Sequence, residues 1–131
     1  MNDVYTYLKS VPAFFAATCE GDQPRVRPFG AVSIFDGRLY IVTNNQKAVY
    51  RQLKENPKLE LCAAGADGTW LRVEAGAVED PRREARVQML TENPSLEALY
   101  TADDGLMTVF YLQNATAVFS SFTAPPEIRT F

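Results

Sequence analysis

Apolar residues recur at two spacings along the chain, and each spacing predicts one kind of element. A separation of four residues, typical of the buried face of a helix, occurs at Val4 and Leu8, at Val49 and Leu53, and at Ala85 and Met89. This spacing predicts three helices, with one or two further helical turns over residues 93–100.

Capping and breaking residues bound these helical segments. Asn2 or Asp3 is expected to cap the first helix, and Pro12 to end it. The second helix is expected within residues 44–57, which close with Asn-Pro, and the third opens at Asp80 and Pro81.

Alternating or continuous apolar runs rich in β-branched and aromatic residues predict strands between these helices. The runs cover residues 13–20, 25–35, 39–43, 58–65, 69–80 and 107–122, and the tight turns DGR and ADG join two hairpins. Pro28 and Gly30 mark a bend or a sheet edge within the second run. Short links between strands predict an antiparallel barrel or sheet with helices packed outside, in one domain over residues 1–131.

The last run, residues 107–122, is apolar on both alternating faces. A strand of this kind needs cover on both sides of the sheet. Because the chain has only 131 residues, we expect a second subunit to supply part of this cover.

Composition excludes several classes of function. The net charge is −3 and no block of basic residues occurs, so no nucleic-acid partner is expected. No apolar run approaches the roughly 20 residues that span a bilayer, which argues against a membrane protein. The N-terminal residues lack the basic and apolar pattern of a secretory signal, so we expect a cytoplasmic location.

The chain contains no histidine and only two cysteines. Catalytic dyads and triads that use histidine are therefore excluded, as are histidine-ligated metal sites. Cys19 and Cys62 lack CxxC spacing and are expected to be free thiols. No side chain is identified as catalytic, so any chemistry is expected to come from a bound cofactor.

Three cations lie at informative places in the predicted elements. Arg25 and Arg27 are two residues apart in a strand, so their side chains leave the same face of the sheet. Lys47 falls at the start of the helix within 44–57, where a cation opposes the helix dipole at a cost of about 0.3–1 kcal/mol. A bound oxyanion would turn this cost into an attraction.

Neutral donors precede Lys47 in the sequence: Asn44, Asn45 and Gln46, with Thr43 before them. Together with the free N–H groups of a helix start, they predict a phosphate site that needs no glycine-rich loop. The alternative is an ordinary surface helix beside solvated strand arginines.

The third predicted helix serves as an internal comparison. It also begins with cations, Arg82 and Arg83, but Glu79 and Asp80 precede them and offer carboxylates to its start. Only the helix that follows Lys47 lacks an acidic opening.

The order of these motifs resembles a known family. Four stretches are similar to the pyridoxamine 5′-phosphate oxidase-related, FMN-binding split β-barrel proteins: the run R-x-R-P-F on one strand, LYIVTNNQK on the next, a helix ending in Asn-Pro, and the closing run over 109–131. The resemblance implies a homodimer with FMN at its interface. It also implies that Arg27 and Lys47 hold the phosphate, that Pro28 and Phe29 lie beside the flavin ring, and that Thr43 ends the next strand of the site.

The expected cofactor-binding residues are Arg25, Arg27, Pro28, Phe29, Thr43, Asn44, Asn45, Gln46, Lys47 and Trp70. Trp70 stands where the family places a side chain near the flavin, although an aromatic of the core or of a dimer interface is the alternative. Of the three cations, Arg25 is the one expected to be only a solvated strand arginine.

Departures from the full-length oxidases narrow the expected function. Val32 replaces a family lysine, and the C-terminal residues APPEIRTF lack the tryptophan and histidine that recognise pyridoxal phosphate. We therefore expect an FMN-dependent oxidoreductase of another small molecule, such as an NAD(P)H-dependent flavin, quinone or nitro reductase. The alternatives are a non-catalytic flavin-binding or sensing module, and a relative that uses the deazaflavin F420.

Overall fold

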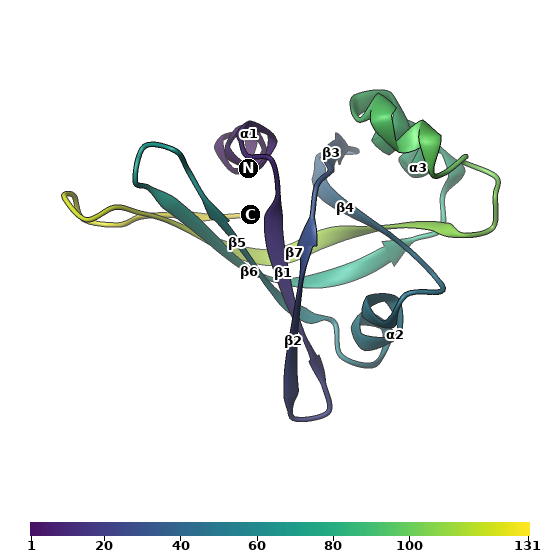
Figure 1. The fold of residues 1–131 in the computed structure, drawn as a ribbon, viewed down its shortest axis with the longest axis horizontal. Helices are drawn as coiled ribbons and strands as arrows, with labels where there is room; N and C mark the ends of the chain where they lie inside the picture. The colour runs from purple at the N-terminus through teal and green to yellow at the C-terminus, as the bar shows by residue number, and fades with distance from the viewer.

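The computed structural model describes residues 1–131 as a curved sheet with helices around it (Figure 1). The helices are α1 (Asn2–Ser10), α2 (Ala48–Glu55), α3 (Arg83–Glu92) and the 3-10 helix η1 (Pro94–Ala98). The strands are β1 (Phe14–Glu20), β2 (Gln23–Phe29), β3 (Val32–Phe35), β4 (Arg38–Asn44), β5 (Lys58–Ala64), β6 (Trp70–Asp80), β7 (Met107–Ser120) and β8 (Glu127–Thr130).

All strand pairs are antiparallel, in the order β2-β1-β5-β6-β7-β4-β3, and β8 pairs with the second half of β7. The sheet does not close, because β2 and β3 remain as its two edges. This arrangement confirms the expected antiparallel split barrel with peripheral helices.

Residues 25–35 form two strands, whereas the sequence predicts one bent strand. The bend at Pro28 and Gly30 separates the two strands. As a result, β2 pairs with β1 at one edge of the sheet, and β3 pairs with β4 at the other edge. The expected hairpin over residues 25–43 is therefore only β3 with β4, closed by Asp36 and Gly37 at positive φ.

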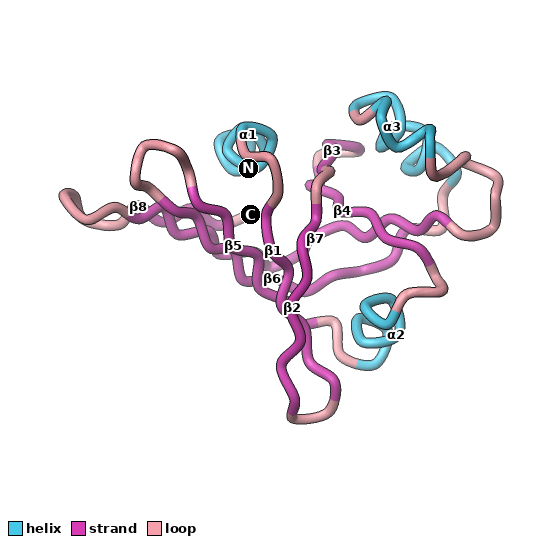
Figure 2. The backbone as a smooth tube through the Cα atoms, in the orientation of Figure 1, coloured by secondary structure: helices cyan, strands magenta, loops and turns pink.

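The face of the sheet that carries the larger core is here called the inner face. Phe14, Leu61, Val73 and Phe110 lie in this core, and the predicted apolar residues of α1 and α2 pack into it. The opposite, outer face has a second core only over β3, β4 and the start of β7, where α3 contributes Ala85, Met89 and Leu90. Figure 2 shows α2 and α3 on opposite sides of β4.

The rest of the outer face has no helix over it. This uncovered part consists of β1, β2, β5, the first half of β6, the second half of β7, and β8. Four of the seven large apolar side chains that are exposed lie on it or beside it: Phe15, Val26, Phe122 and Ile128.

Smaller differences from the sequence expectations occur at the two ends of the chain. Met1, not Asn2 or Asp3, is the N-cap of α1, although Asp3 does accept a hydrogen bond from the Val4 amide at 2.9 Å. Strand β8 was not expected, because its four residues are all exposed and carry no apolar pattern. No helix of the structure is long and apolar enough to cross a membrane.

Candidate functional site

Arg27 lies on the inner face of β2, against α2. Its Nη1 donates to the Ala16 carbonyl at 3.1 Å and to Thr18 Oγ1 at 2.7 Å, and its Nη2 donates to Gln52 Oε1 at 2.7 Å. The Nε–H and one Nη2–H have no acceptor in the protein, so donors remain for a bound oxyanion. Burial, with the neighbouring charge of Arg25, lowers the pKa of the Arg27 guanidinium from its usual value.

Arg25 leaves the same face of β2 but is more exposed and is already paired. Its guanidinium contacts Glu20 at 2.8 Å, and Glu20 also binds Arg51 of α2 at 3.0 Å. These hydrogen bonds, that from Arg25 first, lower the pKa of the Glu20 carboxyl. The cluster of Arg25, Arg27 and Arg51 thus contains three cations and one carboxylate.

Lys47 is the N-cap of α2, one residue before the helix begins. No side chain caps this helix, no acidic residue lies in its first turn, and Lys47 makes no ion pair. The start of α2 therefore combines an unpaired cation with unsatisfied N–H groups, which is the arrangement that favours an anion.

The start of α3 also has no side-chain cap, but carboxylates lie beside its cations: Glu84 is in its first turn, and Asp80 precedes it. Asp80 Oδ1 accepts a hydrogen bond from the Arg82 amide at 3.0 Å, and Asp80 Oδ2 binds the Arg82 guanidinium at 2.9 Å and the Tyr40 hydroxyl at 2.7 Å. Burial alone would raise the pKa of Asp80, but these hydrogen bonds hold it at about 2. Burial and the contact with Asp80 raise the pKa of Tyr40 to about 12.

The sequence predicts that Glu79 offers its carboxylate to the start of α3, but Glu79 lies away from this helix. Its side chain points to the inner face, where it accepts hydrogen bonds from Tyr50 at 2.9 Å and Lys54 at 3.0 Å, both on α2. Adjacent residues of a strand point to opposite faces, so Glu79 and Asp80 cannot both reach the same helix.

Thr43 lies at the end of β4, four residues before Lys47. Its side chain is 4% exposed, and Thr43 Oγ1 is one of two buried side-chain oxygen or nitrogen atoms with no hydrogen-bond partner. The other is Ser33 Oγ on β3. A buried hydroxyl without a partner is costly, and a ligand can satisfy it.

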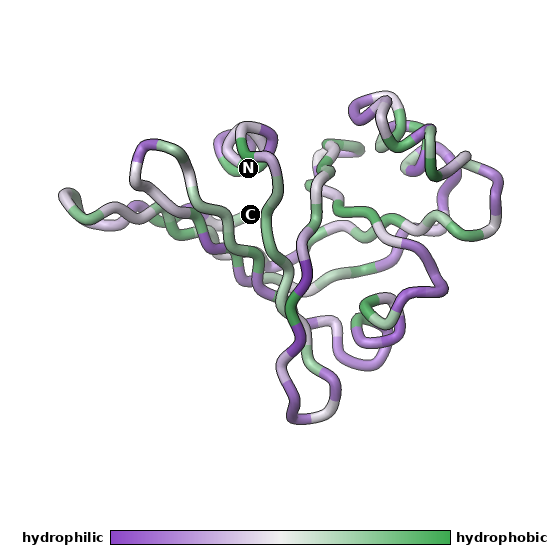
Figure 3. Tube along the Cα trace, in the orientation of Figure 1, coloured by the Kyte–Doolittle hydropathy of each residue, from purple (hydrophilic) through white to green (hydrophobic).

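The amides before Lys47 are used to build the loop. Asn44 donates to the Tyr100 hydroxyl at 3.2 Å, Asn45 donates to the Gly105 carbonyl at 2.8 Å, and Gln46 Nε2 donates to Asn45 Oδ1 at 2.9 Å. These side chains hold the loop between β4 and α2 in place. Figure 3 shows this loop as a hydrophilic stretch that leads into α2.

The remaining predicted residues do not all join this region. Phe29 packs edge-on against Phe14 in the core, at a ring distance of 6.1 Å, and Pro28 lies on the outer face opposite Phe15. Trp70 is also on the outer face, at the far end of β6, where its ring lies 5.0 Å from that of Phe122. Within one chain, Trp70 and Arg27 are therefore on opposite faces of the sheet.

Two important residues of the region, Thr18 and Gln52, were not singled out from the sequence. Gln52 is 2% exposed, and its Oε1 accepts hydrogen bonds from both Thr18, at 2.6 Å, and Arg27. The sequence does carry a signal for them, because each is a polar residue beside apolar residues that are buried. Thr18 continues the alternation of Phe14 and Ala16, and Gln52 lies next to Leu53.

Comparison with known proteins identifies the family. The family model described as pyridoxamine 5′-phosphate oxidase matches residues 3–117. The chain is 40% identical to a NimC/NimA family protein from Clostridium acetobutylicum, with a TM-score of 0.97 over 100% of this chain and 92% of that one. A comparison with curated proteins finds no match.

More distant structures share the fold alone. General Stress Protein 26 from Bacillus anthracis is 16% identical, with a TM-score of 0.78 over 99% of this chain and 97% of that one. A heme binding protein from Mycobacterium smegmatis is also 16% identical, with a TM-score of 0.69 over 95% of this chain and 55% of that one. On the match of residues 3–117, the chain belongs to the pyridoxamine 5′-phosphate oxidase family.

Proposed function

We propose that the protein binds FMN and acts as a flavin-dependent oxidoreductase on a small molecule. The observation that carries this proposal is the start of α2, where the unpaired Lys47 and uncapped N–H groups follow the unpartnered, buried hydroxyl of Thr43. A phosphate satisfies all three kinds of group, because it accepts hydrogen bonds and carries negative charge.

Each residue has a separate part in holding the cofactor. Lys47 supplies charge to the phosphate, and the N–H groups of α2 supply directional donors. Arg27 keeps free donors on its guanidinium while its other N–H groups fix its position against Thr18 and Gln52. When bound, the flavin supplies the hydride and electron chemistry.

The proposed substrate and electron donor are inferred from the family and from the absence of histidine. The chain has no histidine, and the two carboxylates in contact with α2, Glu20 and Glu79, are paired with cations, which suits a reaction whose chemistry is carried by the cofactor. We propose quinone-like or nitroaromatic acceptors, with NADH or NADPH as the electron donor.

We further propose that the protein is a homodimer. The support is the uncovered part of the outer face, where Phe15 is 49% exposed and Val26 is 67% exposed. Exposed apolar side chains gathered on one face favour association.

The test begins with protein purified without added flavin. We expect a flavin absorption spectrum, or saturable binding when FMN is added, and reduction of the bound flavin by NADH or NADPH. Failure to bind FMN would overturn the proposal. Tight binding without reduction by either nucleotide would favour the alternative, a binding or sensing module, and preferential binding of F420 would replace the cofactor.

A further inference from the structure

Four cations lie on the inner face, where β2 meets the start of α2. Arg25 and Arg27 leave the same face of β2, and Lys47 and Arg51 are four residues apart at the start of α2. Like charges four residues apart on a helix destabilise it. Glu20 is the only carboxylate that pairs with any of the four cations. In a chain with a net charge of −3, this region therefore has an excess of positive charge.

The phosphate of FMN balances only part of this charge. A phosphate monoester carries about −1.5 to −2 at pH 7. The proposed function assigns Arg27 and Lys47 to the phosphate of FMN. Arg25 and Arg51 then share the single negative charge of Glu20. Positive charge on these two arginines therefore stays unbalanced when FMN is bound.

Glu20 holds the guanidinium groups of Arg25 and Arg51 beside each other. Its Oε1 accepts two hydrogen bonds from Arg25, at 2.8 and 3.2 Å, and its Oε2 accepts one from Arg51 at 3.0 Å. A guanidinium has five N–H donors, so Arg25 keeps three and Arg51 keeps four without an acceptor in the protein. Both side chains are about half exposed. The pair can therefore bind a further oxyanion from solvent through several charge-assisted hydrogen bonds.

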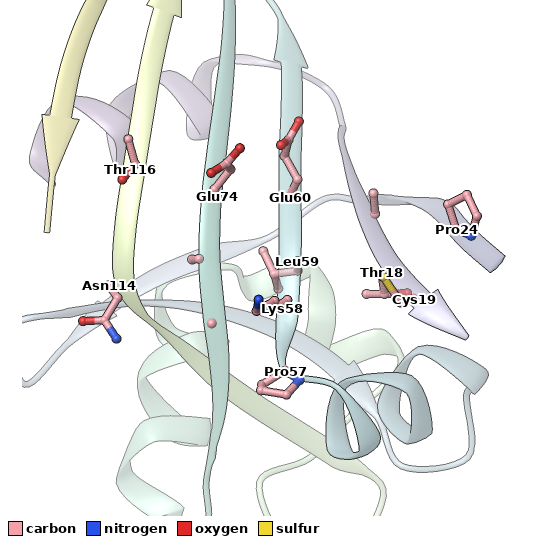
Figure 4. Close-up of a pocket in the computed structure, with 13 residues that line it drawn as sticks. Thr18, Cys19, Pro24, Pro57, Lys58, Leu59, Glu60, Glu74, Asn114 and Thr116 are labelled. Carbon is pink, nitrogen blue, oxygen red and sulfur yellow. The ribbon is translucent and has the colours of Figure 1, made fainter. Parts of the chain in front are cut away.

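Two hollows elsewhere on the molecule are less suited to an anion. The larger, of about 630 Å³, lies on the outer face, where Glu60 and Glu74 project side by side near Lys58 (Figure 4). The smaller, of about 330 Å³, is lined by Arg38 and Arg82 together with three acidic residues. In both hollows the acidic residues outnumber the basic ones. An anionic ligand is therefore favoured on the inner face, next to the proposed site for the phosphate of FMN.

We propose that Arg25 and Arg51, bridged by Glu20, form a second site for a phosphate monoester, and that this monoester is the 2′-phosphate of NADPH. Arginine commonly receives this phosphate in proteins that bind NADP. The 2′-phosphate is also the one group that NADPH has and NADH lacks. The inference rests on the proposed function and specifies its electron donor. NADPH gives one hydride, and solvent one proton, to the oxidised flavin, and NADP⁺ leaves with its 2′-phosphate unchanged.

Binding of adenosine 2′,5′-bisphosphate tests the site without any reaction. This compound carries the 2′-phosphate of NADPH, and 5′-AMP differs from it only by lacking that phosphate. In calorimetric titrations of the wild type saturated with FMN, the bisphosphate should bind at least about tenfold more tightly than 5′-AMP, the scale of one charge-assisted hydrogen bond. The double variant Arg25→Gln with Arg51→Gln should bring the two affinities to within about threefold of each other. Equal affinities in the wild type would overturn the proposal.

Arg83→Gln is the matched control. Arg83 is an exposed arginine that pairs with one carboxylate, Asp103, but it lies on α3. Its replacement makes the same change of charge as each single variant and should keep the preference for the bisphosphate. A loss of preference equal to that of the double variant would indicate an effect of net charge alone and would overturn the site.

Reduction of the bound flavin identifies the source of the phosphate. The wild type should have a kcat/KM for NADPH at least about tenfold above that for NADH, and the double variant should lose most of this ratio through a higher KM for NADPH. A preference for the bisphosphate without a preference for NADPH would overturn the assignment to the electron donor.

Two alternative roles of the arginines give different results. If Arg25 and Arg51 bind the phosphate of FMN itself, the double variant loses as much FMN affinity as Lys47→Ala, and the bisphosphate competes with FMN. If they only join β2 to α2, the double variant unfolds at a lower urea concentration but binds the bisphosphate as the wild type does. Either result would overturn the second site.

The proposed function can fail independently of this inference. A protein that binds no FMN, yet binds the bisphosphate through Arg25 and Arg51 in the Lys47→Ala background, has the second site and lacks the proposed cofactor. A flavoprotein that NADH and NADPH reduce equally well keeps the proposed function and overturns the inference.

Discussion

Arg27 on the edge strand β2 donates a 2.7 Å hydrogen bond to the buried side chain of Gln52 on α2. Gln52 Oε1 also accepts the hydroxyl hydrogen of Thr18, so β1, β2 and α2 meet at one oxygen atom. This contact fixes the helix that begins at Lys47 against the strand pair that carries Arg27. The two cations expected to bind one phosphate are thus held by the same helix.

Replacing Arg27 should therefore change the stability of the protein as well as its affinity for FMN. Arg27→Ala removes three hydrogen bonds, and we expect the free energy of unfolding in urea to fall by about 1–3 kcal/mol without flavin. Arg25→Ala, which breaks an exposed pair with Glu20, should cost less than about 1 kcal/mol. Equal losses for the two variants would contradict the structural part assigned to Arg27.

Lys47→Ala should weaken the binding of FMN without destabilising the folded protein. We expect FMN affinity, measured by fluorescence titration, to fall by about 1.5–3 kcal/mol, the scale of a charge-assisted hydrogen bond. The apo protein should unfold at the same or a slightly higher urea concentration, because an unfavourable charge leaves the helix start. Lys54→Ala, in the last turn of the same helix and paired with Glu79, is the matched control and should keep its FMN affinity.

Asp80 should make the protein sensitive to acid. The pKa of the Asp80 carboxyl is about 2 in the folded protein, against 3.8 for an unperturbed aspartate as in the unfolded chain. The ionised carboxylate therefore stabilises the fold above pH 3.8. This contribution, about 2 kcal/mol, is lost as the pH falls from 3.8 through 2. Urea unfolding between pH 5 and 2 should show the loss in wild type and in Asp22→Asn, a change in an exposed turn. Asp80→Asn should be less stable at pH 7 and should lose less stability over this range.

Gly65, in the turn between β5 and β6, should resist substitution. A Cβ atom there would lie 2.6 Å from Tyr7 Oη, 2.8 Å from Asp67 Oδ1 and 3.0 Å from Thr69 Oγ1, and Tyr7 and Thr69 share a 2.8 Å hydrogen bond. Gly65→Ala must displace Tyr7, and we expect a loss of about 1–2 kcal/mol in thermal or urea unfolding. The loss should be smaller in a Tyr7→Phe background, where the hydroxyl is already absent. An equal loss in both backgrounds would show that the clash with Tyr7 is not the cause.

The helices and hairpins were predictable because their signals are local. The four-residue spacing of Val49 and Leu53 and of Ala85 and Met89 identifies buried helix faces, and all four residues are buried. The DGR and ADG turns likewise join strands that are close in sequence. Lys47 at an uncapped helix start was predictable for the same reason.

The pairing of the strands was not predictable from such local patterns. Pro28 and Gly30 indicate a bend, but they do not show that β2 and β3 lie at opposite edges, since that depends on pairings with β1 and β4. The contact of Arg27 with Gln52 joins residues 25 positions apart and depends on the same pairings. Glu79 contacts α2 and not α3, because the alternation of side chains along β6 places it on the opposite face from Asp80.

The link between β2 and β3 has a mechanical consequence. Only Gly30 and Ala31 separate these strands, so the two unpaired edges of the sheet are joined by covalent bonds where hydrogen bonds are missing. Any difference in angle between the two edges must be accommodated by the backbone torsions of these two residues. A Cβ atom at Gly30 would meet no other atom within 4 Å, whereas Ala31 is buried in the core that α3 covers. The edge that carries Arg27 is thus anchored to the core beneath α3 through a single buried alanine.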